Sequence, residues 1–383
     1  MYTRLISVKI ILKKARNKMR ELFYKISYAC NRNYHCVVIY DEKELSELWP
    51  DRGVTCISEE KLAEPKDGIM VSIIVPLYNA EKYIHTCLDS LIKQKTNYRY
   101  EIIAINDGSL DKTSEILYEY ANKYEFINVI TQDNKGISCT RNVGIMNSKG
   151  MYIGFIDQDD WVDERYIEKL VSTAETEQAD IVKCGFNVWD NGAFFEKISF
   201  GNKTIMDGRD ELLLQMPSYI WSGIYRRSVF NYIRFPEGYW YEDMIVRLLI
   251  YRSSKKLVNL EVGLYNKLYH KNNASSVVWS TKNAQCLEQF YLPKSLIQDN
   301  NKLGIDGDVY LYEGVLLEYS RIMVYRIAGL PIDVQKKVFM GCKEVLSSIY
   351  KDEYYEQMTP DMKEWNDIFV TNNYRRWKAN AYV

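Results

Sequence analysis

The chain is predicted to be an α/β protein with a mostly parallel sheet that helices cover on both faces. Between residues 69 and 280, short apolar runs typical of buried strands alternate with segments whose apolar residues recur at helical spacing. Such alternation is typical of strand–helix–strand units with right-handed crossovers. Polar motifs follow the ends of several predicted strands, where sheets of this kind bind ligands.

The predicted strands and helices follow one another in a regular order. Residues 71–75 form an apolar run that ends at Pro76, as expected of a buried strand. The apolar stripe over residues 84–92 predicts the first helix after it. Further strands are predicted at 101–105, 128–131, 152–156 and 180–184, and further helices at 116–124, just before Gly150, and at 166–174.

Three regions are predicted along the chain: an N-terminal extension over residues 1–68, the sheet domain over 69–280, and a helical region over 281–383. Apolar residues recur at helical spacing between Leu5 and Ile26, among many Lys and Arg side chains. This basic amphipathic helix would either rest on an anionic membrane surface or pack on the protein or a second subunit. The last region is interpreted as a helical cap over the sheet domain, in preference to a membrane or acceptor contact.

Composition limits the partners and the compartment. A formal net charge of −1 over 383 residues gives no general basis for binding nucleic acid. The eight cysteines are widely spaced and form no CxxC pair, which argues against a zinc site and a disulfide scaffold. With no signal peptide and no apolar run long enough to span a bilayer, we expect a cytoplasmic protein. The basic helix would add a peripheral contact at the inner face of the cell membrane.

The acidic segment Asp157-Gln158-Asp159-Asp160 is the strongest chemical signal. Three carboxylates in four residues at the end of a predicted strand repel one another, and their burial without partners would be costly. A bound divalent cation would remove that cost, and Mg²⁺ or Mn²⁺ prefers oxygen ligands and can also hold a nucleotide diphosphate. The alternative is a solvated acidic turn, but the apolar strand directly before the segment favours a site.

Two other acidic positions carry weaker signals. Asp107 follows the second predicted strand and can accept a hydrogen bond from a base N–H or a ribose hydroxyl, although Ser109 or Asp111 could simply cap the next helix. The pair Glu242-Asp243 could supply a general base or could only mark a helix N-terminus, where acids are favoured.

The order of the motifs is more specific than any one of them. The chain carries Val71–Asn79, Asn106–Ser109, Asn134–Ser138 with Arg141, and Asp157–Asp160. With these motifs, residues 70–276 resemble the family 2 glycosyltransferases. The resemblance implies the GT-A fold and an inverting, metal-dependent transfer from a UDP-sugar, with Mn²⁺ or Mg²⁺ as cofactor. It further implies that a hydroxyl of a glycan or lipid-linked saccharide accepts the sugar in bacterial surface polysaccharide synthesis.

The resemblance also implies a role for each matching residue. Asp159 would be the direct metal ligand, Asp157 would lie toward the ribose, sugar and metal, and Asp243 would be the catalytic base. His270 and Lys271 would contact phosphate or metal, although a lone histidine is as readily structural. The remaining nucleotide-sugar contacts would come from Pro76, Tyr78, Glu81, Asp107 and Arg141.

The chain departs from the family pattern at three places. Asn106 stands where aspartate is commoner, Gly223 stands where lysine is frequent, and the N-terminal extension has no counterpart in the minimal family. Two other functions fit the sequence less well. A non-catalytic partner that binds nucleotide-sugar or glycan would need no intact acids, yet all of them are present. A nucleotidyltransferase would carry a glycine-rich basic loop after the first strand, which residues 78–81 lack.

Overall fold

The computed structural model describes residues 41–380 apart from 67, 191 and 271–282. The chain divides into two compact units. The helical unit takes its described residues from Met1–Arg52, Val278–Lys294 and Gly307–Val383, and the sheet unit takes its residues from Gly53–Val277 and Ser295–Asp306. The predicted basic helix near the N-terminus and Lys271 lie outside the described residues.

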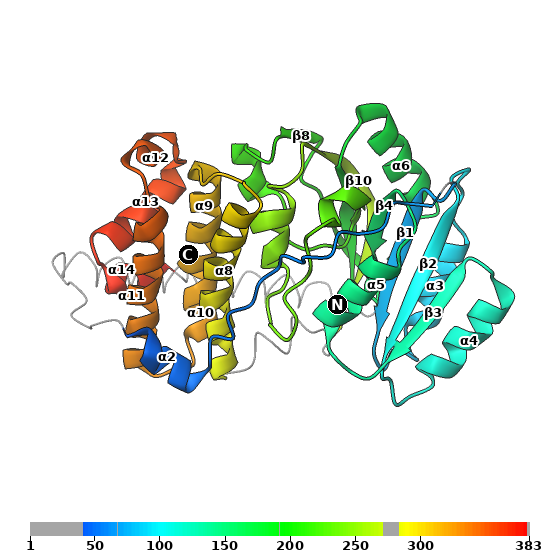
Figure 1. Ribbon diagram of the computed structural model, residues 1–383, viewed down its shortest axis with the longest axis horizontal. Helices are drawn as coiled ribbons and strands as arrows, with labels where there is room; N and C mark the ends of the chain where they lie inside the picture. The colour runs from blue at the N-terminus through cyan, green and yellow to red at the C-terminus, as the bar shows by residue number, and fades with distance from the viewer. Residues whose placement is uncertain (1–40, 67, 191, 271–282, 381–383) are drawn as a thin grey trace, which may run out of the picture. The chain divides into compact units, whose positions relative to one another are not determined.

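The sheet unit contains one ten-stranded sheet, with the order β3-β2-β1-β4-β9-β6-β10-β5 and with β7 and β8 attached to β6 and β10 (Figure 1). Strand β1 pairs in parallel with β2 and β4, and β2 pairs in parallel with β3. The α/β class and the five predicted strands are confirmed. Their bounds are β1 (Val71–Leu77), β2 (Tyr100–Asp107), β3 (Ile127–Gln132), β4 (Tyr152–Phe155) and β6 (Ile181–Asp190).

The other strands were not predicted, because they are short, exposed or irregular. Strand β9 antiparallel to β4 and β6 closes the gap between the two halves of the sheet, and β10 runs parallel to β6 with register shifts around Gly263. A sequence pattern of regular alternation does not find such strands. Their bounds are β5 (Trp161–Val162), β7 (Ala193–Ile198), β8 (Lys203–Met206), β9 (Gly223–Arg226) and β10 (Lys256–Tyr269).

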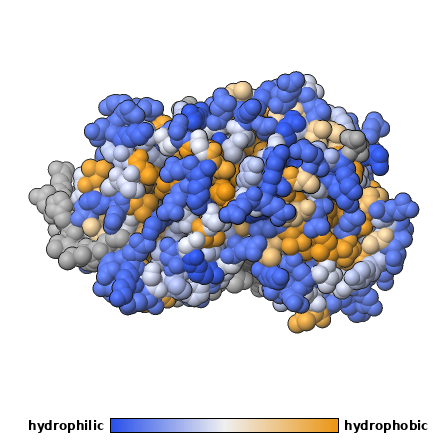
Figure 2. Space-filling model, in the orientation of Figure 1, coloured by the Kyte–Doolittle hydropathy of each residue, from blue (hydrophilic) through white to orange (hydrophobic). Residues whose placement is uncertain are grey.

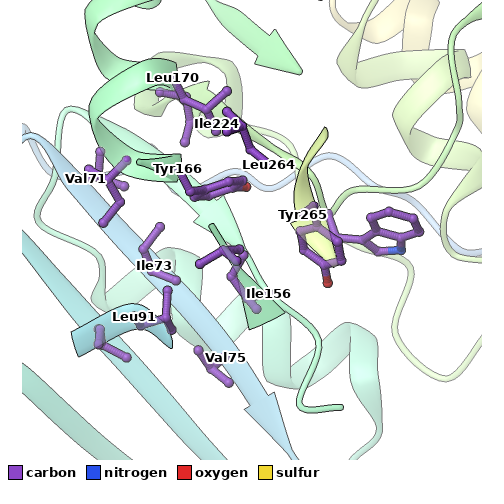
Figure 3. Close-up of a cluster of buried hydrophobic side chains, with 14 of the residues drawn as sticks. Val71, Ile73, Val75, Leu91, Ile156, Tyr166, Leu170, Ile224, Leu264 and Tyr265 are labelled. Atoms are coloured by element: carbon purple, nitrogen blue, oxygen red, sulfur yellow. The ribbon is translucent and has the colours of Figure 1, made fainter. Parts of the chain in front are cut away.

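The two faces of β1 are covered by different helices because successive side chains of a strand point to opposite faces. Figure 3 shows Val71, Ile73 and Val75 on the face toward α3 (Ile84–Ile92) and α6 (Tyr166–Glu177). Each such buried side chain contributes about 1.5–3 kcal/mol. Ile74 points the other way, toward α5 (Ile137–Asn147), where a Cβ on Gly144 would lie 2.5 Å from its side chain.

Helix α4 (Thr113–Lys123) packs in the same buried cluster as α3 and α6, because its Leu117 belongs to that cluster. The four predicted helices of this region are therefore confirmed, with helices on both faces of the sheet. Shorter turns follow in the second half of the unit. These are the 3-10 turns η1 (Glu211–Gln215) and η2 (Arg227–Phe230) and the π-helical segment η3 (Val246–Ile250).

The described part of the helical unit contains no strand, as the sequence of the C-terminal region predicts. The predicted apolar stripe is buried there, with Leu311, Val315 and Tyr319 all withdrawn from solvent. Helix α8 contributes residues to both units. The elements are α2 (Glu42–Leu48), η4 (Ala284–Leu287), α8 (Glu288–Lys302), α9 (Val309–Leu317), η5 (Glu318–Ile322), α10 (Met323–Ile327), α11 (Ile332–Ile349), α12 (Asp352–Gln357), α13 (Pro360–Val370) and α14 (Tyr374–Asn380).

The surface carries the mixture of polar and apolar groups expected of a folded protein. On the face drawn in Figure 2, hydrophilic side chains are spread over both units and apolar residues form smaller areas between them. Within the described residues, every helix is too short or too polar to cross a membrane.

Candidate active site

The loops that follow β1 and β4 are joined by one side chain. Gln158 Oε1 accepts from the backbone N–H of Tyr78 (2.7 Å), and its Nε2 donates to the Tyr78 carbonyl (3.1 Å). The acidic segment is therefore fixed against the first loop. Pro76 is buried within β1, whereas the Tyr78 side chain is 44% exposed and free to meet a flat ligand.

Glu81 is tied to the segment that begins α4. Its Oε2 accepts from the Lys112 N–H (3.2 Å), and its own N–H donates to Asp111 Oδ2 (3.1 Å). These contacts hold the first loop beside the second, so Glu81 would shape the loop in addition to its predicted contact with the nucleotide-sugar.

Asp107, at the end of β2, organises the turn that leads into α5. Its carboxylate accepts from Gln132 Nε2 (2.7 Å) and from the N–H groups of Lys135 and Gly136 (both 2.9 Å). The following residue is Gly108, with φ of +72°, where a Cβ would lie 2.7 Å from the Asn134 nitrogen. This close crossing of two loops requires glycine, and it fixes the start of the helix that carries Arg141.

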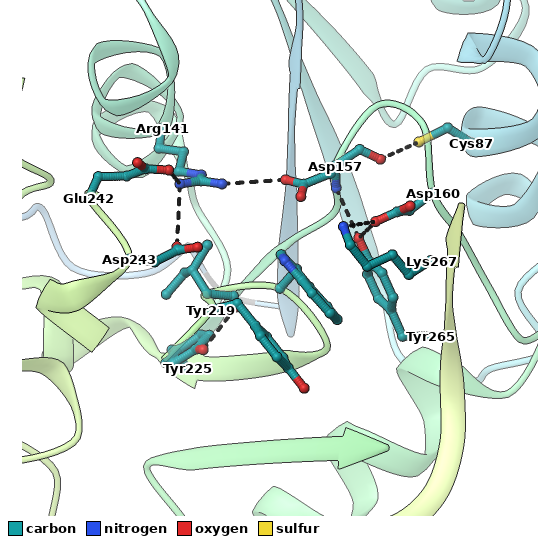
Figure 4. Close-up of polar contacts among 12 residues, drawn as sticks. Cys87, Arg141, Asp157, Asp160, Tyr219, Tyr225, Glu242, Asp243, Tyr265 and Lys267 are labelled. Carbon is teal, nitrogen blue, oxygen red and sulfur yellow. Dashed lines mark hydrogen bonds and ion pairs between the residues drawn. The ribbon is translucent and has the colours of Figure 1, made fainter. Parts of the chain in front are cut away.

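Arg141 brings together acids from distant parts of the chain (Figure 4). Its guanidinium donates to Glu242 Oε1 (2.8 Å), and it lies 3.4 Å from Asp157 Oδ1 and 3.8 Å from Asp243 Oδ1. Burial opposes its charge, but the three carboxylates together raise the pKa of Arg141 above its ordinary value. The residue is therefore a buried, permanently charged centre for Asp157, Glu242 and Asp243.

Asp243 has an environment suited to proton transfer. Burial and the neighbouring Glu242 raise the pKa of its carboxyl to about 7, against the lowering effect of Arg141. Its Oδ1 is buried and receives no hydrogen bond from the described residues, while the side chain as a whole is 38% exposed. The chain reaches this position through Tyr241, whose φ of +65° is unusual for a residue with a side chain and costs energy at the approach to the site.

Asp159 lies beside His270, and the resemblance implies a metal or phosphate contact for each of them. Asp159 Oδ2 and His270 Nε2 are 2.8 Å apart. The imidazole stacks on the ring of Tyr83, with the ring centres 4.9 Å apart and an angle of 15° between the planes. This stacking fixes the ring at the end of β10 facing the acidic segment.

The third acid of the segment, Asp160, is a structural anchor that motif reasoning did not separate from its neighbours. It is buried and accepts from the Tyr265 hydroxyl (2.7 Å) and the Leu268 N–H (2.8 Å), with Lys267 Nζ 3.7 Å away. Burial raises its pKa to about 8, and Lys267 acts in the opposite direction. The Tyr265 oxygen also accepts from the Asp157 N–H (3.2 Å), so β10 fixes the whole segment (Figure 4).

The donor groups of Asp159 and His270 suit a divalent ion such as Mn²⁺, since a carboxylate oxygen and an imidazole nitrogen face each other at close range. In the described part of the chain, no group of three or more His, Cys, Asp or Glu side chains could hold a metal ion. A cation here would therefore complete its coordination with water or with ligand oxygens.

Two hollows lie elsewhere on the sheet unit. One, of about 430 Å³, is lined by residues such as Thr173 and Asn259, and the other, of about 700 Å³, is lined by residues such as Arg209 and Tyr232. Neither is lined by any of the acids gathered around Arg141 or beside His270.

Comparison with known proteins identifies the family. The family described as "Glycosyl transferase family 2" matches residues 72–233. The chain is 34% identical over 251 residues to the uncharacterized glycosyltransferase EpsJ of Bacillus subtilis (strain 168), an alignment that covers 62% of this chain and 72% of EpsJ. The chain belongs to glycosyl transferase family 2. This family 2 enzyme is a glycosyltransferase, as the ordered motifs predict.

Further similarity extends beyond the matched segment. The glycosyltransferase GlyA of Streptococcus pneumoniae is 33% identical over 302 residues, which is 75% of this chain but only 42% of GlyA. Among solved structures, residues 1–349 of S. aureus TarS in complex with UDP-GlcNAc superpose with a TM-score of 0.64 at 19% identity, covering 81% of this chain and 90% of that one. The GT-A fold predicted for this family 2 glycosyltransferase is thereby confirmed.

Proposed function

We propose that this glycosyltransferase moves a sugar from a UDP-sugar to a hydroxyl of a glycan or lipid-linked acceptor, with inversion, in bacterial surface polysaccharide synthesis. The observation that carries the proposal is the convergence on Arg141 of Asp157, from the loop after β4, and Asp243. Asp157 would then lie beside the donor, and Asp243 would take the proton of the acceptor hydroxyl.

Asp243 is proposed as the catalytic base. An acceptor hydroxyl has a pKa far above 7, so it needs a carboxylate within hydrogen-bonding reach to take its proton as the oxygen attacks the anomeric carbon. With its pKa raised to about 7, Asp243 is a stronger base than an ordinary aspartate and is still substantially ionised near neutral pH. A single displacement with a single base inverts the anomeric centre and needs no protein nucleophile.

The donor is proposed to bind along the loops after β1, β2 and β4. The exposed ring of Tyr78 offers a surface for the base. A carboxylate has about four lone-pair positions, and Asp107 uses three of them within the protein, which leaves one for a donor on the nucleotide. UDP is favoured by the resemblance and by the similarity in fold to TarS, whose crystal structure is a complex with UDP-GlcNAc.

Asp159 and His270 are proposed to hold Mn²⁺ or Mg²⁺, with Asp157 as a further candidate ligand. When bound, such a cation supplies stabilisation of the negative charge on the departing diphosphate. The protein's own contribution is to keep the two ligands in place: Tyr83 orients the imidazole, and Tyr265 with Asp160 fixes the backbone on either side of Asp159.

A screen of nucleotide-sugars with Mn²⁺ tests the proposal. We expect release of UDP from one UDP-sugar, and an NMR spectrum of the glycoside product with the anomeric configuration opposite to that of the donor. Retention of configuration, or turnover confined to GDP- or dTDP-sugars, would contradict it. Tight UDP-sugar binding with no turnover on any acceptor would instead favour the non-catalytic partner.

A further inference from the structure

The segment that leads to Glu242 and Asp243 has no regular secondary structure. Residues 234–243, all of which the structure describes, form turns and bends but no helix or strand. Gly238 and Tyr241 within it have positive φ values of +75° and +65°. A backbone of this kind keeps its conformation only where its surroundings fix it. The positions of the two acids therefore depend on contacts that other parts of the fold make with this segment.

One side chain of α5 holds the start of the segment. Asn142 Oδ1 accepts from the Phe235 N–H (2.8 Å), and Asn142 Nδ2 donates to the Phe235 carbonyl (3.0 Å). The same Nδ2 donates to Glu237 Oε1 (2.9 Å). Because Asn142 is only 7% exposed, water competes little for these bonds. A single amide thus binds both backbone polar groups of Phe235.

The ring of Phe235 extends this anchoring to the centre of the site. The Arg141 guanidinium lies over the ring, with its Cζ 5.3 Å from the ring centre. The ring also packs edge-on against Phe155, the last residue of β4, with the ring centres 5.9 Å apart. The face of an aromatic ring attracts a cation, and the attraction is stronger where water is excluded. Phe235 is buried, so its ring supports the guanidinium from the side of the sheet core.

The direction of the guanidinium is not fixed by hydrogen bonds alone. Within the described residues, the buried Arg141 Nε–H meets no acceptor. The other guanidinium nitrogens lie 2.8 Å from Glu242, 3.4 Å from Asp157 and 3.8 Å from Asp243 (Figure 4). A turn of the guanidinium plane would change all three distances, and the Phe235 ring limits that turn.

We propose that Asn142 is a positioning residue: it places Phe235 so that the ring keeps the Arg141 guanidinium directed at the three acids. Asn142 and Arg141 are adjacent on α5, so one residue of the helix holds the segment and its neighbour holds the acids. This inference rests on the proposed role of Asp243 as catalytic base. Asn142 does not need to touch either substrate, because it acts through Phe235 and Arg141.

The experiment compares Asn142→Ala with Asn147→Ala, using Mn²⁺ and the UDP-sugar that the nucleotide-sugar screen identifies. Asn147 ends the same helix, is exposed, and donates only to the Val143 carbonyl among its printed partners in α5 (2.8 Å), so its replacement controls for loss of an asparagine from α5. For Asn142→Ala we expect kcat to fall about tenfold to a hundredfold, because the base and the acids around Arg141 lose their alignment. Asn147→Ala should match the wild type.

The Michaelis constant separates positioning from a role in stability. The loops proposed to bind the donor are held by Gln158 and Asp107, so in Asn142→Ala the KM for the UDP-sugar should stay within about threefold of the wild type. A role in stability alone would lower the Tm and leave the kcat of the folded enzyme unchanged.

Phe235→Leu tests the path from Asn142 to Arg141. It removes the ring and leaves Asn142 in place, so we expect a fall in kcat of the same kind. Because both residues act through Arg141, the kcat of the double variant should lie within about threefold of the more impaired single variant, whereas independent effects would multiply. Phe235→Leu also carries the test if Asn142→Ala does not fold.

Wild-type kcat in the folded Asn142→Ala variant, or multiplication of the two effects in the double variant, would overturn the proposal. If Asn142→Ala does not fold, wild-type kcat in Phe235→Leu would overturn it. Asp243→Asn is measured in parallel. Full turnover in that variant would show that the base assignment is wrong and would remove this inference with it. Low turnover there beside a fully active Asn142→Ala would overturn this inference alone.

Discussion

At the scale of single residues, the candidate site depends on how one carboxyl group is surrounded. Burial and Glu242 draw Asp243 toward the neutral form, and Arg141 draws it toward the charged form. The balance places its pKa far above that of an aspartate in water, which suits a group that must take a proton and later release it.

Replacement of Asp243 by asparagine preserves the shape of the side chain and removes its basicity. We expect kcat to fall on the order of a hundredfold or more, because general-base catalysis contributes about that much. UDP affinity, measured by calorimetry, and the circular dichroism spectrum should stay as in the wild type. An Asp243→Asn enzyme that kept full turnover would exclude Asp243 as the base.

The pH dependence of kcat/KM follows from the same group. A base works only when deprotonated, and burial raises the pKa of Asp243 to about 7. Activity should therefore be lost as the pH falls through about 7, whereas an ordinary aspartate would hold it to much lower pH. Rates measured from pH 5 to 9 in buffers of constant ionic strength would show the limb, and a flat profile down to about pH 5 would contradict the assignment.

Some of these residues were within reach of sequence analysis and others were not. Asp157, Asp159 and Asp243 stand in short motifs with a recognisable order, so each could be named as a candidate from the sequence. Tyr265 carries no motif. Its hydroxyl contacts the loop that follows β4, and the sequence does not show that β10 lies next to that loop.

At the scale of elements, the loop after β4 contacts three other parts of the candidate site: α5, β10 and the loop after β1. Its first acid contacts Arg141 of α5, its third acid is anchored on β10, and Gln158 holds the loop after β1. Asp159 lies between these fixed points, with its carboxylate directed at His270.

Replacement of Asp159 by alanine removes a proposed metal ligand while the anchors around it remain. We expect Mn²⁺-dependent binding of UDP to be lost, because a cation would then be left with His270 and the ligand oxygens alone. Calorimetric titrations with UDP, with and without Mn²⁺, would measure this. Gln158→Ala tests the loop without touching a proposed ligand. UDP binding that remained Mn²⁺-dependent in Asp159→Ala would show that another residue holds the cation.

The elements themselves were predicted unevenly. Strands β1 to β4 are buried runs of apolar residues joined by helices, and their pattern is plain in the sequence. Strand β7 is exposed, β9 has four residues, and β10 changes register near Gly263. These segments are strands because they hydrogen-bond to neighbouring strands, and the pattern of apolar residues within each segment does not indicate it.

At the scale of the whole molecule, the chain contains a sheet unit with the proposed catalytic residues and a separate helical unit. Helix α8 supplies residues to both units, so a boundary between domains cannot be read from the composition at that point. The basic segment at the N-terminus was predicted to contact either a membrane or protein, and the two possibilities call for different experiments.

Deletion of residues 1–30 separates these possibilities. If the segment binds an anionic surface, the full chain should float with vesicles that contain anionic lipid and the shortened chain should not, and added salt should weaken the binding. Neutral vesicles serve as the control. Equal partitioning of the two chains would remove the membrane hypothesis and direct attention to packing on the protein or a second copy.

The ion pair between Arg141 and Glu242 has a consequence for the newborn chain. The two residues are 101 positions apart. A ribosome adds about 5–20 residues per second, so roughly 5–20 seconds pass after Arg141 is made before its principal partner exists. During most of that interval, helix α5 carries a cation destined for the interior with Asp157 made but with Glu242 and Asp243 still missing. We expect the fold around it to stay open until the later residues emerge, and the active centre to be among the last parts to assemble.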